Sequence, residues 1–143
     1  GYIWGCKAAA EKMKSGGAIV NIASLAGKRG SRNNSIYCAT KFAEVGLTQA
    51  YAKELGERGI RVNAVCPVYV RTDELLKNLG GDHPDIKDEE PNQFLDNWSR
   101  KNTSLRRLPE SHEVADFCVY LASPWASAVT GQNINLDCGT LPQ

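Results

Sequence analysis

The sequence Gly16-Gly-Ala-Ile-Val-Asn-Ile-Ala-Ser24 carries the clearest structural signal in this chain of 143 residues. Residues 18–23 are almost continuously apolar, as in a short parallel strand that is buried on both faces. The two glycines end a helical segment that comes before them, residues 2–14. The residues that follow, 25–35, are rich in Gly, Ser, Asn and basic side chains and predict a loop. The stretch therefore predicts a buried strand after a helix, with Ser24 at its end.

Helices and strands alternate along the rest of the chain. A long helix is expected from residue 35 to about 57 and closed by Gly59, followed by a strand over residues 60–66 that Pro67 ends. Thr72 and Ser111 are expected to be the N-caps of later helices. The remaining expected elements are helices over 72–79, 92–102 and from 111 onward, and a strand over 132–137. This order predicts an α/β sheet of three strands with flanking helices.

The apolar residues of the long helix do not form a single stripe. They spread around most of the helical circle and are Phe42, Val45, Leu47, Ala50, Tyr51 and Leu55. Such a helix is expected to be buried on more than one side, against the sheet and against a second partner. This pattern predicts a homo-oligomer, either a dimer or a tetramer.

Composition excludes several classes of function. The net charge is +1 and no basic run is long enough for a nucleic-acid surface. No apolar run approaches the ~18 residues of a membrane span. The five cysteines lack any C-x-x-C spacing and no histidine lies near them, which favours free thiols in a reducing, cytoplasmic setting and no metal site.

Tyr37 and Lys41 stand four residues apart at the start of the long helix, and Tyr37 follows Ser24 by 13 residues. Residues at i and i+4 share a helix face, so the Lys41 ammonium is expected beside the Tyr37 phenol. An ordinary tyrosine has a pKa of about 10, so a phenol that acts as a base near neutrality must be stabilised by about 4 kcal/mol as phenolate. A neighbouring cation is one of the few groups that supply this much.

Together with the motifs around Tyr37 and Lys41, the sequence resembles the short-chain dehydrogenase/reductase family over its whole length. The resemblance rests on five motifs in order: residues 16–24, Tyr37-Cys-Ala-Thr-Lys41, Arg61-Val-Asn-Ala-Val-Cys-Pro67 with Val68-Tyr-Val-Arg-Thr72, residues 109–123, and residues 130–137. It implies part of a Rossmann-like, doubly wound parallel sheet. It also implies an NAD(P)-dependent oxidoreductase that interconverts a small-molecule alcohol and a ketone by hydride transfer.

The resemblance also assigns roles to residues. Tyr37 would be the general acid/base, Lys41 would lower the pKa of the tyrosine and hold the nicotinamide ribose, and Ser24 would polarise the substrate oxygen. Tyr37 and Lys41 thus belong to the catalytic set and to the cofactor site. The other implied cofactor contacts, to NAD or NADP, are Pro67, Val68, Val70 and Thr72. Residues 80–102 would form a lid over the substrate.

Two positions depart from the family pattern. Val68 stands where the family usually has glycine, and its Cβ would crowd the nicotinamide or alter the turn. Asp137-Cys138-Gly139 replaces the common Asp-Gly-Gly and is expected to adjust only the terminal packing.

The family's glycine-rich phosphate loop has no counterpart in this sequence, because neither Gly16-Gly17 nor Gly80-Gly81 joins a strand to a helix. The resemblance therefore identifies residues 1–143 as the second, catalytic half of the domain, with the dinucleotide-binding half absent. We expect a fragment of a longer chain, or an assembly that covers the bare edge of the strand over 18–23. The 143 residues alone are expected to be inactive, without measurable nicotinamide binding.

A second interpretation stays open from the sequence. The chain could be a non-catalytic interaction module that keeps the oligomer-forming helices of the same fold. The retained Ser24, Tyr37 and Lys41 favour the enzyme, whereas the missing phosphate loop and Val68 favour the module.

Overall fold

Three parallel strands form the centre of the protein. The computed structural model describes residues 1–80, 86 and 89–142. The strands are β1 (Ala18–Ile22), β2 (Arg61–Pro67) and β3 (Asn133–Leu136), in the order β1-β2-β3. Ile19 pairs with Val62, and Val65 pairs with Ile134. The prediction of a three-stranded α/β sheet is confirmed.

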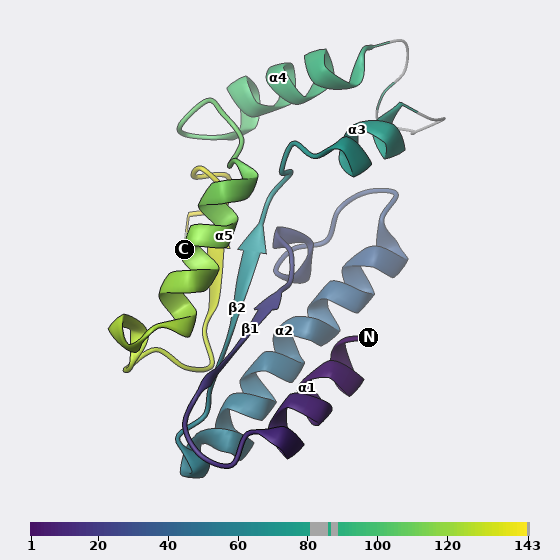
Figure 1. Cartoon of the computed structure of the whole chain (residues 1–143). Coiled ribbons are helices and arrows are strands. Elements are labelled where there is room, and N and C mark those ends of the chain that lie inside the picture. Colours follow the sequence, from purple (N-terminus) through teal and green to yellow (C-terminus); the bar gives the residue numbers. More distant parts are fainter. Residues whose placement is uncertain (81–85, 87–88, 143) are drawn as a thin grey trace.

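Helices cover both faces of this sheet (Figure 1). Helices α1 (Tyr2–Lys12) and α2 (Ser35–Leu55) lie side by side on one face, and α5 (Ser111–Ala122) lies on the other. Helices α3 (Asp73–Leu79) and α4 (Pro91–Asn102) stand beyond the carboxyl end of β2. The described residues also include three short 3-10 turns, η1 (Leu25–Gly27), η2 (Gly56–Arg58) and η3 (Pro124–Ala126). Of the lid expected over 80–102, residues 81–85, 87 and 88 lie outside the described residues.

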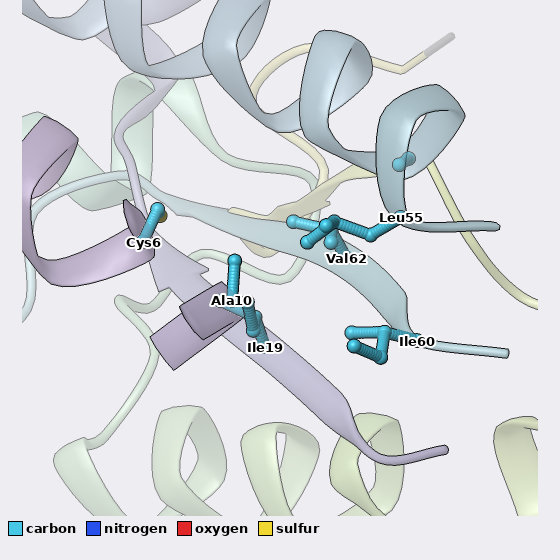
Figure 2. Packing of buried hydrophobic residues seen from close by; sticks show 7 residues of the cluster. Cys6, Ala10, Ile19, Leu55, Ile60 and Val62 are labelled. Carbon is cyan, nitrogen blue, oxygen red and sulfur yellow. The ribbon is translucent and has the colours of Figure 1, made fainter. Parts of the chain in front are cut away.

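Two apolar layers hold the helices to the sheet. Figure 2 shows the layer between α1, α2 and the strands. Its buried members are Cys6, Ala10, Ile19, Ala52, Leu55, Ile60 and Val62. On the opposite face Leu121 of α5 packs on Val65 of β2, with the half-buried Val114, Phe117 and Cys118 around them.

The termini of the elements follow local chemistry. Helix α2 ends at Leu55, and the chain turns through η2 to Gly59, whose φ of 67° suits glycine. The prediction that Ser111 caps α5 is wrong by one residue. Glu110 is the N-cap, because its side chain and that of Glu113 bond reciprocally to each other's backbone N–H. Ser111 is the first helical residue.

Buried amides tie the strands to their neighbours. Asn63 of β2 donates from Nδ2 to the Val129 carbonyl (2.8 Å) and accepts from the Gln132 backbone N–H (3.0 Å). Asn21 of β1 donates from Nδ2 to Thr48 Oγ1 of α2 (3.0 Å) and accepts from the Cys6 thiol of α1 (3.5 Å). The second set of contacts fixes α1 and α2 against the same strand.

All five cysteines are free thiols, as the sequence predicts. Within the described part of the chain, no helix combines the length and the apolar character that a membrane crossing requires. Within the same residues, no group of three or more potential ligands could hold a metal ion.

Candidate active site

The candidate residues gather where the strands end. Ser24 follows β1, Tyr37 lies in the first turn of α2, and residues 67–72 follow β2. In an open parallel sheet this carboxyl edge is where ligands bind. A cavity of about 780 Å³ opens here. Its lining includes the candidates Ser24, Tyr37, Pro67, Val68, Val70 and Thr72. Lys41 is the one candidate outside this lining.

Ser24 caps the backbone turn that follows it and also lines the cavity. Its Oγ accepts a hydrogen bond from the Ala26 backbone N–H at 3.1 Å and so caps η1. The hydroxyl proton takes no part in that contact and is available to donate. The strand-end capping role and the proposed contact with a substrate oxygen are therefore compatible.

Tyr37 and Lys41 share one face of α2. The Lys41 Nζ lies 5.7 Å from the centroid of the Tyr37 ring. Tyr37 is 47% exposed and lines the cavity. The arrangement expected from the i and i+4 spacing is present.

Two acceptors hold the Lys41 ammonium. Nζ donates to the Ile22 carbonyl at the end of β1 (3.2 Å) and to Glu44 Oε2 (2.8 Å). The Tyr2 ring of α1 lies 6.0 Å from the same nitrogen. An ammonium has three N–H donors, so the two contacts leave one for a further partner.

Sequence reasoning missed both Glu44 and Tyr2. Glu44 is three residues after Lys41 and seven after Tyr37, so the helical period alone places it on their face. That signal was in the sequence. The approach of Tyr2 comes from the packing of α1 against α2, for which the sequence carries no local pattern.

Thr72 is the N-cap of α3, as predicted. Its Oγ1 accepts from the Leu75 backbone N–H at 3.1 Å while the side chain also borders the cavity. Val68 is half-buried and packs on the cluster of Leu79, Leu95 and Leu108. Its φ lies outside the left-handed region, so the turn after Pro67 accepts a side chain without backbone strain.

A match to known proteins covers nearly the whole chain. Residues 1–140 match the family model described as enoyl-(acyl carrier protein) reductase. The chain is 36% identical over 123 residues to 3-oxoacyl-(acyl-carrier-protein) reductase FabG of Chlamydia trachomatis, covering 86% of this chain and 44% of that protein.

Solved structures agree with this match. The structure of sorbitol-6-phosphate 2-dehydrogenase SrlD from Erwinia amylovora superposes with a TM-score of 0.89 at 28% identity, over 99% of this chain and 56% of that one. Carveol dehydrogenase from Mycobacterium avium, solved with NAD, gives a TM-score of 0.78 at 30% identity, over 87% and 46%. Other similar structures hold NADH or NADPH.

The chain spans about half the length of the curated relatives that it matches. The motifs, the parallel sheet and the family match agree with one another. The chain belongs to the short-chain dehydrogenase/reductase family.

Proposed function

We propose that this chain supplies the catalytic side chains of an NAD(P)-dependent oxidoreductase that interconverts an alcohol and a ketone. One observation carries the proposal. Ser24 and Tyr37 border the same cavity at the carboxyl ends of parallel strands, and the Lys41 ammonium lies 5.7 Å from the Tyr37 ring. A hydroxyl donor, a phenol and a fixed cation are the groups that carbonyl reduction needs.

Each residue has a distinct role in this proposal. The Tyr37 phenol donates its proton to the oxygen of the developing alkoxide in reduction and takes it back in oxidation. Ser24 donates a hydrogen bond to the same oxygen and so favours the charge that forms on it. Lys41 stabilises the phenolate form of Tyr37 through its positive charge. The chemistry that bound NAD or NADP supplies here is hydride transfer.

The described residues fit such a cofactor. The free N–H of Lys41 suits a ribose hydroxyl, because two of its three donors are already used by Ile22 and Glu44. The Thr72 hydroxyl accepts from Leu75 and keeps its own proton for a carboxamide oxygen. Pro67, Val68 and Val70 border the same cavity and provide backbone and apolar contacts for a planar ring.

The substrate is proposed to be a small-molecule alcohol or ketone. Similar proteins carry names for a 3-oxoacyl thioester, a sugar-alcohol phosphate and a terpene alcohol, so the family likeness fixes no single compound. The cavity wall combines the aromatic Tyr69 and Trp98 with the polar Asn34 and Asn78. Such a wall suits a compact ketone with both apolar and hydrogen-bonding parts.

A homo-oligomer is part of the proposal. Helices α1 and α2 carry large apolar side chains that are exposed: Ile3 (61%), Trp4 (71%), Ile36 (79%) and Phe42 (46%). Apolar groups of this size on adjacent helices are typical of a surface that a partner covers. Light scattering coupled to size exclusion measures the mass directly, and a monomer would contradict this part.

The experiment for the catalytic proposal uses the complete gene product that carries these residues. Reduction of a panel of ketones is followed with NADH and NADPH, and the parent is compared with Tyr37→Phe and Lys41→Met. We expect Tyr37→Phe to lower kcat by at least about 100-fold, the order of one general acid. Equal activity of Tyr37→Phe and the parent would refute the proposal.

The same exposed helices favour a second candidate, a non-catalytic interaction module. It predicts an oligomer that turns over no ketone in the panel, with Tyr37→Phe indistinguishable from the parent in every measurement. Turnover that depends on Tyr37 excludes it.

A further inference from the structure

Glu44 is a second acceptor of the Lys41 ammonium, besides the Ile22 carbonyl of the strand. Its Oε2 lies 2.8 Å from Lys41 Nζ, and the two side chains are only 16% and 17% exposed. A pair this shielded is screened less by salt and solvent than a surface ion pair. The negative charge of Glu44 therefore offsets part of the effect that the Lys41 ammonium has on the Tyr37 phenol.

The backbone under Glu44 is fixed. Its carbonyl accepts from the Thr48 hydroxyl at 2.9 Å, and Thr48 in turn accepts from the Asn21 amide at 3.0 Å. Lys41 donates to the Ile22 carbonyl, one residue further along β1. The backbone of Glu44 and the Lys41 ammonium are thus both linked to β1, and the carboxylate is held by its own contact with Lys41.

Other titratable groups face this pair from each packed element. Tyr2 of α1 has a buried hydroxyl without a hydrogen-bond partner among the described residues, and burial, followed by the charge of Glu44, raises its pKa. Burial also raises the pKa of the Cys66 thiol of β2, with opposing effects from Lys28 and Lys41 and a further increase from Glu44. Cys6 of α1 adds a third weak acid whose pKa is raised by burial. At neutral pH these three are uncharged. The charged groups around the phenol are then Lys41 and Glu44, together with Arg29 and Arg32, which line the cavity that Tyr37 borders.

We propose that Glu44 is a positioning residue for the Tyr37–Lys41 pair and sets the pH range in which the phenol exchanges its proton. The carboxylate anchors the ammonium and offsets part of its attraction for a phenolate. The working unit is then a triad of acid, cation and phenol on one face of α2. This inference rests on the proposed function, because it concerns the proton transfer assigned to Tyr37.

Glu44→Gln tests the charge without removing the contact. The amide oxygen of glutamine still accepts from Lys41, whereas the negative charge is lost. With its positive charge no longer offset, Lys41 should favour the phenolate more strongly. We expect the acid limb of kcat/KM for alcohol oxidation to move to lower pH by roughly one unit, the order of one charge acting over several ångströms at a partly shielded site. Glu54→Gln, an exposed change on the same helix, is the matched control and should leave the profile unchanged.

A second readout needs neither turnover nor cofactor. Phenolate absorbance is titrated in the unliganded gene product, and the contribution of Tyr37 is isolated by subtracting the curve of Tyr37→Phe. The midpoint of this difference curve should shift in Glu44→Gln by the same amount and in the same direction as the kinetic limb. A purely structural role for Glu44 would lower the thermal midpoint of the protein and leave both pH profiles in place.

The outcomes separate this inference from the proposed function. Full activity in Tyr37→Phe refutes the proposed function. Loss of activity in Tyr37→Phe, together with superimposable profiles for Glu44→Gln and the parent, leaves the proposed function intact and overturns the role of Glu44.

If Glu44→Gln does not fold, the role of Glu44 is tested by a measurement on Glu44 itself in the parent protein. The carboxyl ¹³C resonance of Glu44 should show an inflection at the titration midpoint of Tyr37 in the parent, and this inflection should vanish in Tyr37→Phe. If the ¹³C shift of Glu44 shows no such inflection in the parent, or shows the same one in Tyr37→Phe, the inference is overturned.

Discussion

Gly27 lies directly against the backbone of Lys41. A Cβ on Gly27 would stand 2.5 Å from the Lys41 carbonyl oxygen and 2.8 Å from its carbonyl carbon, closer than real contacts allow. The Gly27 backbone N–H also donates to the Ser24 carbonyl at 2.9 Å. One glycine therefore joins the turn that begins at Ser24 to the turn of α2 that carries Lys41.

Gly27→Ala should disturb stability and the candidate site together. The methyl group forces the η1 turn away from α2, because its nearest neighbours are backbone atoms that cannot rotate aside. Overpacking of this kind costs about 1–3 kcal/mol. Urea unfolding measures this loss. In the same variant, kcat should fall by more than the loss of folded protein explains, because Ser24 and Lys41 no longer keep their relative placement.

Gly30→Ala is the matched control for this prediction. A Cβ on Gly30 meets nothing within 4 Å, and its φ lies outside the left-handed region. Its free energy of unfolding should stay within about 0.5 kcal/mol of the parent, as for ordinary surface changes. Equal losses in the two variants would contradict the close contact between Gly27 and Lys41.

Cys138 stores backbone strain next to the last strand. Its φ of 51° lies in the left-handed region, which costs a residue with a Cβ about 1–2 kcal/mol. The conformation is fixed because Leu105 donates to the Cys138 carbonyl (3.1 Å) and Gly139 donates to the Asp137 carboxylate (3.0 Å). Cys138→Gly removes the strain and adds chain entropy to the unfolded state, so we expect a net gain of about 0.5–1 kcal/mol.

Chemical denaturation under reducing conditions measures the expected increase in the unfolding free energy of Cys138→Gly. Cys118→Gly provides the contrast, because Cys118 sits inside α5 and packs on the inner apolar layer. Glycine in a helix interior costs about 1 kcal/mol. Destabilisation by both glycine variants would mean that the side chain of Cys138 contributes more than its backbone strain costs.

The capping box of α5 makes stability depend on acid pH. The hydrogen bonds from the Arg107 guanidinium, followed by the Glu110 backbone N–H, lower the pKa of Glu113 from 4.5 to about 2. A carboxyl whose pKa is lowered on folding stabilises the protein above its unfolded pKa, and this stability is lost as pH falls through its folded pKa. Unfolding free energy should therefore fall between pH of about 4.5 and 2.

Glu113→Gln should flatten this acid dependence and lower stability at neutral pH, since the ionic contact with Arg107 is absent at every pH. Thermal unfolding at half-unit pH steps measures both effects. The exposed Glu54→Gln should keep the slope of the parent. An unchanged slope in Glu113→Gln would show that other carboxyls produce the acid dependence.

The sequence contained enough to predict the elements and most of the residues that gather at the candidate site. Apolar runs and glycines located β1 and the end of α2, and the i, i+4 spacing placed Lys41 beside Tyr37, since these depend on local periodicity. The prediction of Ser111 as the cap of α5 fails because Glu113 bonds to the Glu110 backbone N–H and closes a capping box one residue earlier, where Arg107 also donates to it. The approach of Tyr2 to Lys41 depends on how two helices pack, which no short pattern records.

Asn63→Leu tests whether the amide in β2 is structural. The side chain is 1% exposed, and its two hydrogen bonds join β2 to the segment that leads into β3. Leucine is similar in size but leaves the buried Gln132 N–H without its partner and the Val129 carbonyl with only the longer contact from Arg61 Nη1 (3.4 Å). A buried unsatisfied group costs about 1–3 kcal/mol, so we expect a loss of at least that size in urea unfolding. Hydrogen exchange should quicken at the Gln132 amide before it does in β1. Uniform acceleration across the sheet would instead indicate global destabilisation without a local role for Asn63.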